Sequence, residues 1–248
     1  MTNLVRAELR KLLSTQVWFW MLLLSISITA LLVIVGFTAG GHIQTSDVKD
    51  IFTTGLTSYI AAFVLGVLGV TTEFRYQTIT PTLLATPSRW RLMAAKLITY
   101  VVVGATMAAA CVATTLVIAV PWLSSRHVSY AFFGDGVAQR MIEVASIVGL
   151  FALIGLGFGA AVRNQIVAVT VGIVYLLVIE NLLRVIPRVR VVYPYLPGGG
   201  IQAIISPHEA NDGGVRVFGT AGGYTVLILW AAVLAAVGAA YSLNRDIT

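Results

Sequence analysis

Charged residues are scarce in this sequence. Asp, Glu, Lys and Arg together make up 10% of its 248 residues, whereas an ordinary soluble domain carries about 25%. Hydrophobic residues make up 58%, so the chain has too few polar side chains to cover the surface of a soluble fold. This composition excludes a soluble enzyme, a disordered chain and a nucleic-acid-binding domain. It predicts an all-α integral membrane protein.

Several chemical motifs are also missing. Cys111 is the one cysteine, which excludes an intrachain disulfide and a thiolate metal cluster. No lysine follows a glycine, so the chain has no P-loop to hold nucleotide phosphates. His208 and Glu209 begin a metalloprotease-like pattern, but Asp212 stands where the second histidine would be needed. We therefore expect no catalytic role, no metal and no cofactor in this chain.

Six charge-poor apolar runs are each long enough to cross a bilayer core of about 30 Å as a helix. They cover approximately residues 17–39, 53–72, 97–120, 142–162, 164–184 and 220–242. The first run is longer than the apolar core of a signal peptide and is followed by five more, so we interpret it as a retained helix. These runs predict a single transmembrane domain over residues 1–248.

The distribution of Lys and Arg predicts the orientation. The side that holds both termini carries nine of them and the opposite side seven. The basic N-terminal segment and the connection after the second run place the termini in the cytoplasm. Arg184, Arg188 and Arg190 are evidence for the opposite orientation.

The segment before the first run, residues 3–14, has the pattern of an amphipathic helix. Its apolar residues recur at helical spacing on one side, and its basic residues lie elsewhere. This predicts a helix in the cytoplasmic membrane interface; the alternative is a basic flank that only sets topology. The apolar set is Val5, Leu9, Leu12 and Leu13, and the basic set is Arg6, Arg10 and Lys11.

The connection over residues 73–96 is longer than a simple link requires. Glu73 and Arg75 stand where the second helix leaves the membrane, and polar and apolar residues alternate after them. We expect this segment to be a docking surface for a cytoplasmic partner, with a solvated loop whose arginines bind anionic lipid as the alternative. The candidate residues are Glu73, Arg75, Thr78, Ile79, Thr82, Leu83, Leu84 and Arg89.

Polar residues also occur toward the side of the membrane opposite the termini. Glu180 and Asn181 interrupt the fifth run, and two interpretations of Glu180 stay open: an ion pair with Arg184 one turn on, or a polar group in a transport pathway. The outer connection, residues 185–219, is broken by proline and glycine. Its candidate residues are Tyr195, Pro197, Gly198 and Gly199, before a short surface helix near residues 201–205.

Two stretches carry a resemblance to a known family. The run GVLGVTTEFRYQTITPTLLATPSRWRLMAAKL and the later YLPGGGIQAI are similar to the corresponding regions of permease subunits of bacterial type-2 ABC exporters, especially actinobacterial ones. The first run matches the pattern T-x-E-[YF]-R-x-x-T-[IL], then T-L-x-A-T-P-x-R, then A-A-K. With the six spans and the amphipathic start, the resemblance covers nearly the whole chain.

The resemblance implies a specific assembly. Two six-helix permeases, identical or homologous, form the channel in the bacterial inner membrane, and two cytoplasmic P-loop ATPase subunits bind ATP and Mg. The N-terminal segment would be an elbow helix, the 73–96 connection would contain the coupling helix, and the segment before the last span would form short outer or re-entrant helices. The expected cargo is a hydrophobic or amphipathic drug, lipid or similar molecule.

Two other classes of function exist for an apolar, helical chain of this kind. An intramembrane enzyme is disfavoured because the catalytic constellations are absent from the sequence. A secondary transporter or channel without an ATPase remains the alternative, with Glu180 as its one candidate for an ionisable group inside a span.

Overall fold

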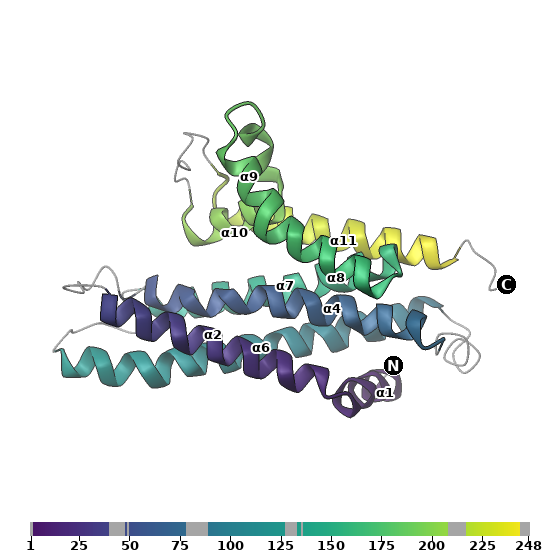
Figure 1. Ribbon diagram of the computed structural model, residues 1–248, viewed down its shortest axis with the longest axis horizontal. Helices are drawn as coiled ribbons and strands as arrows, with labels where there is room; N and C mark the ends of the chain where they lie inside the picture. The colour runs from purple at the N-terminus through teal and green to yellow at the C-terminus, as the bar shows by residue number, and fades with distance from the viewer. Residues whose placement is uncertain are drawn as a thin grey trace.

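The computed structural model describes residues 2–39, 48, 50–77, 89–126, 133–134, 136–207 and 217–243. Over these ranges the chain is helical and contains no strand (Figure 1). Six of its helical stretches are long and apolar enough to cross a membrane, which indicates a multi-pass membrane protein. The predicted all-α class, with six helices of the length and composition needed to span a membrane, is thereby confirmed.

The long helices follow the predicted runs closely, with two exceptions. α6 begins well before residue 97, and α7 begins at residue 137 rather than 142. The difference arises because charged side chains end an apolar run without ending a helix. The elements are α1 (Thr2–Ser14), α2 (Val17–Ala39), η1 (Phe52–Thr57), α4 (Ser58–Arg75), α6 (Arg89–Ser125), α7 (Val137–Val162), α8 (Gln165–Val174), η2 (Tyr175–Ile179), α9 (Glu180–Val185), η3 (Arg190–Tyr195), α10 (Pro197–Ile205) and α11 (Thr220–Leu243).

Two of the crossings are irregular. The second is a 3₁₀ segment, η1, that runs directly into α4, and the fifth contains one π-helical stretch, η2, between α8 and α9. Short π segments inside helices are frequent at functional sites. Here the irregularity comes directly before Glu180, the first residue of α9.

α7 is the central helix and packs against α4, α6 and α11. Its contact with α4 depends on glycine. A Cβ atom at Gly66 or Gly155 would overlap the backbone of the facing helix, at Ala152 and Phe63 respectively. Gly66 and Gly155 therefore allow α4 and α7 to pack closely within one chain.

The arrangement places the two candidate regions at opposite ends (Figure 1). α1 lies at one end of the bundle, beside the end of α4 and the start of α6, and the end of α11 lies toward the same side. η3 and α10 lie toward the opposite end, where α10 packs against α11.

Candidate functional site

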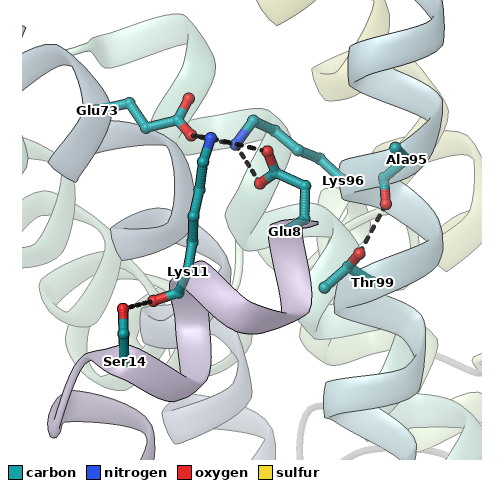
Figure 2. Close-up of polar contacts among 7 residues, drawn as sticks. All are labelled: Glu8, Lys11, Ser14, Glu73, Ala95, Lys96 and Thr99. Atoms are coloured by element: carbon teal, nitrogen blue, oxygen red, sulfur yellow. Dashed lines mark hydrogen bonds and ion pairs between the residues drawn. The ribbon is translucent and has the colours of Figure 1, made fainter. Parts of the chain in front are cut away.

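A cluster of four charged side chains joins α1, α4 and α6 (Figure 2). The Nζ atom of Lys96 lies 2.7 Å from Oε2 of Glu8 and 2.7 Å from Oε1 of Glu73. Lys11 Nζ lies 3.0 Å from Glu8 and 3.1 Å from the same Glu73 oxygen. Two ammonium groups and two carboxylates thus form an alternating cluster with no net charge.

Local structure explains how these side chains meet. Glu8 and Lys11 are three residues apart in α1 and so project on one face of that helix. Glu73 is in the last turn of α4, and Lys96 is in the second turn of α6. Leu9 and Leu12 of α1 pack on the core beside them, and this apolar contact presses the α1 charges against the bundle.

Burial makes this cluster energetically important. The side chain of Lys96 is 5% exposed, whereas that of Lys11 is 45% exposed. Burial opposes ionisation of Glu8, but the attraction and hydrogen bonds of Lys96 and Lys11 outweigh it and hold the pKa of Glu8 below its ordinary value. For Lys11, burial likewise opposes the charged form, yet Glu73 and Glu8 raise its pKa. The cluster therefore favours the charged forms of Glu8 and Lys11.

A cavity of about 350 Å³ lies beside the cluster. Leu65, Leu68 and Tyr100 contribute to its walls, and Glu73 contributes a carboxylate. Oε2 of Glu73 is buried and has no hydrogen-bond partner among the residues that the structure describes. A lining that combines apolar side chains with charged ones suits an amphipathic molecule.

The predicted docking residues fall into three groups. Glu73 and Arg75 are described: Glu73 belongs to the buried cluster, and Arg75 Nη1 donates to Oε1 of Gln165, which begins α8, at 3.2 Å. Arg89 begins α6, but its side chain is not among those described. The remaining candidates, Thr78, Ile79, Thr82, Leu83 and Leu84, lie outside the described residues.

The predicted N-terminal helix is present as α1, with Arg6 and Arg10 exposed. Its buried face differs from the expected stripe. Leu13 is 55% exposed, and the buried residue is Glu8, which apolar periodicity alone would not select. The position of α1 in a membrane interface stays a prediction.

A second polar site lies at the opposite end, around Glu180. Its Oε1 accepts a hydrogen bond from the backbone N–H of Gly198, in the first turn of α10, at 2.5 Å. The expected ion pair with Arg184 is not found: within the described part of the chain Glu180 forms no ion pair, and Arg184 donates to the Tyr193 side chain. The reason is that the carboxylate turns toward α10 instead of along its own helix.

The other end of α10 is held by a second buried charge. Arg140 Nη2 donates to the carbonyl oxygen of Ile205, the last residue of α10, at 2.9 Å. Arg140 also pairs with Glu143 at 3.1 Å inside α7. A carboxylate at the N-terminus and a guanidinium at the C-terminus complement the helix dipole, so α10 is fixed between two spans.

The outer-segment candidates surround this contact. Pro197 begins α10, and a Cβ atom at Gly198 would stand 2.8 Å from the Glu180 carboxyl carbon. A Cβ at Gly199 would overlap the carbonyl oxygen of Tyr193. Tyr195 is exposed, and its carbonyl accepts from Trp230 Nε1 at 2.9 Å. Asn181 is also exposed, and it donates to the carbonyl of Leu177 in its own helix.

Sequence reasoning gave no role to Glu8, Lys96 or Arg140. Each is a charged residue at the margin of an apolar run, where solvent exposure is the ordinary expectation. One available signal was the position of Glu8, one turn from Leu12 and three residues from Lys11 on α1. The partners of Arg140 and Lys96 are distant in sequence and give no local signal.

Comparison with known proteins adds no assignment. No protein-family model matches the chain, and no curated protein sequence matches it.

Proposed function

We propose that this chain is the membrane-spanning permease subunit of an ATP-driven exporter. It would work in a bacterial inner membrane with both termini in the cytoplasm, and it would form the pathway for a hydrophobic or amphipathic molecule. Its partners would be a second permease, membrane lipid and two copies of a P-loop ATPase that binds ATP and Mg.

The observation that carries the proposal is the buried charge cluster. Glu73 belongs to the motif that resembles exporter permeases, and Lys96 ends the same motif. Lys96 pairs with Glu8 of α1, and Glu73 pairs with Lys11 of α1. A force applied to the connection between α4 and α6 would pass through these contacts to α1, as an ATP-driven movement requires.

The cavity beside the cluster supports an amphipathic cargo. Glu73 lines it together with apolar side chains, and the Glu73 Oε2 atom is buried without a hydrogen-bond partner among the described residues. A molecule with an apolar body and a hydrogen-bond donor would satisfy both features.

Docking of the ATPase can be tested in the 73–96 connection. The charged substitutions Leu83→Asp and Leu84→Asp should abolish co-purification of the ATPase or uncouple ATP hydrolysis from transport, because losing a buried interface anchor costs about 2 kcal/mol or more. Arg91→Gln is the matched control and should leave the complex assembled. Normal assembly and transport in both aspartate variants would refute the docking surface.

A secondary transporter is the second candidate, and one observation favours it. Glu180 is a buried ionisable group in the fifth span. Transport by proteoliposomes that contain the chain alone, driven by an ion gradient without ATP, would establish this alternative and exclude the exporter.

A further inference from the structure

The cavity beside Glu180 has the size of a headgroup, not of a whole drug molecule. It holds about 250 Å³ and lies between the start of α4, the α8–α9 helix, η3 and α10. Drug-sized ligands occupy pockets of about 300–1,000 Å³. A small polar group fits this space, and any larger apolar part of the ligand has to remain outside it.

Two opposite charges line this cavity. Glu180 is 4% exposed, and its known contact is the neutral amide of Gly198, so no ion pair with a described residue balances its charge. Arg184, one turn further along α9, lines the same cavity. A cationic ligand would be attracted by Glu180 and repelled by Arg184. An anionic ligand would be attracted by Arg184 and repelled by Glu180. A zwitterion satisfies both groups.

Other polar atoms match an ammonium group. Oε1 of Gln202 is buried and accepts no hydrogen bond from the described part of the chain, and Gln202 lines the cavity with Glu180. Both supply acceptors, and an ammonium group supplies three donors. Tyr59 and Tyr193 also line the cavity, and aromatic rings are favourable neighbours for a cation.

The position of the cavity identifies the source of the zwitterion. Glu180 and Arg184 lie in the last turns of the fifth spanning helix, which ends at Val185, and lipid headgroups surround the ends of spanning helices. On the same helix, Leu182 is 53% exposed and Val185 is 73% exposed. Acyl chains can pack on these residues while the headgroup enters the cavity.

The geometry points to a binding site for the headgroup of a zwitterionic aminophospholipid in this cavity. The ammonium lies between Glu180 and Gln202, and the phosphate lies at Arg184, whose guanidinium suits phosphate oxygens. This inference goes beyond the proposed exporter function and does not depend on it, because binding needs only this chain.

The test measures lipid binding by the purified chain in detergent, without an ATPase. The probes are dihexanoyl phosphatidylethanolamine, the anionic dihexanoyl phosphatidylglycerol, a cationic O-ethyl phosphocholine with the same tails, and free phosphoethanolamine. The ethanolamine lipid should bind at least about tenfold more tightly than each other probe, a difference of about 1.4 kcal/mol. Equal affinity for the anionic lipid, or tighter binding of the cationic one, overturns the zwitterion site. If free phosphoethanolamine binds as tightly as the ethanolamine lipid, the conclusion that the headgroup belongs to a lipid is wrong.

Variants locate the site. Glu180→Gln keeps an oxygen to accept from Gly198 but removes the charge, and Arg184→Gln removes the opposite charge. Each should weaken binding of the ethanolamine lipid about tenfold, and Ile201→Trp should block it by filling the cavity. Arg188→Gln, at an exposed arginine outside the cavity, is the control and should not change the affinity. Unchanged binding in folded Glu180→Gln and Ile201→Trp proteins, with unfolding temperatures like the parent's, overturns the inference.

Discussion

Lys96 in α6 donates a hydrogen bond of 2.7 Å to Glu8 in α1, although 88 residues separate them in the sequence. Both side chains are buried, and the contact fixes the N-terminal helix to the bundle. Glu73, from the end of α4, shares the same ammonium group. Three helices at one end of the molecule are therefore joined through one lysine.

This arrangement predicts unequal effects of the two lysines on stability. Lys96→Met should lower the free energy of unfolding by about 3–5 kcal/mol, because it leaves two buried carboxylates with one half-exposed lysine between them. Lys11→Met should cost about 1 kcal/mol or less, since water screens that side chain. Thermal unfolding in detergent measures the stability of both variants. An equal loss of stability would show that burial does not determine how much each lysine contributes.

The pH dependence of stability should reflect Glu8. Its pKa is lowered in the folded protein by Lys96 and Lys11 against the opposing effect of burial. The stabilisation is therefore present above the ordinary carboxyl value of 4.5 and is lost as the pH falls through the lowered folded pKa. Glu8→Gln should make the unfolding temperature less dependent on pH in this acidic range. An unchanged acid profile in the variant would contradict the pairing.

Two glycines of α7 provide a matched test of helix packing. Gly155→Ala should destabilise the protein by at least about 1–3 kcal/mol, because its Cβ would overlap the backbone of Phe63 in α4. Gly149→Ala should be neutral or stabilising by up to about 1 kcal/mol, since a Cβ there meets no atom within 4 Å. Calorimetry on the two variants distinguishes them. Similar destabilisation by both would show that α4 and α7 do not approach as closely as described.

The contact between Glu180 and α10 can be tested through protease protection. Glu180→Ala removes the acceptor for the Gly198 amide, and Gly198→Ala pushes the carboxylate away. Both should increase cleavage around α10 several-fold, while Glu180→Gln should remain close to the parent because it retains an oxygen acceptor. If Glu180→Gln is cleaved as rapidly as Glu180→Ala, the charge and not the hydrogen bond holds α10.

Orientation requires an experiment in intact cells. Single cysteines introduced at Ser46 and Ser88, in a Cys111→Ala background, report the two sides of the membrane. A membrane-impermeant reagent should label residue 46 and not residue 88 if the termini are cytoplasmic. The reverse pattern would invert the topology and remove the basis for an ATPase contact at the 73–96 connection.

The helices could be predicted from the sequence because their cause is local. An apolar run of about 20 residues has no alternative to a helix in a bilayer, where every backbone group needs an internal partner. α2 begins and ends where its run does, and α1 and α11 agree with their runs to within one residue. Charged margins made prediction less accurate at α6 and α7, since those helices continue beyond their apolar cores.

The sites could be predicted only in part. Glu73 was identified because it stands where the second helix leaves the membrane, Lys11 because it belongs to the basic set of the amphipathic segment, and Glu180 because it interrupts an apolar run. The partners of these residues were not predicted. For Glu180 the sequence indicated an ion pair with Arg184 on the same helix as one interpretation, whereas the structure shows a hydrogen bond from Gly198.

By itself, the sequence determined the helical class, the number and approximate limits of the spans, and the positions where charge interrupts them. Only the tertiary structure decided that Glu8 meets Lys96, that Gly155 lies against Phe63, and that α10 is held between Glu180 and Arg140. The physical reason is one of range. Hydrophobicity acts on each segment independently, whereas a buried charge gains its stability from whichever helix the packing of the whole bundle places beside it.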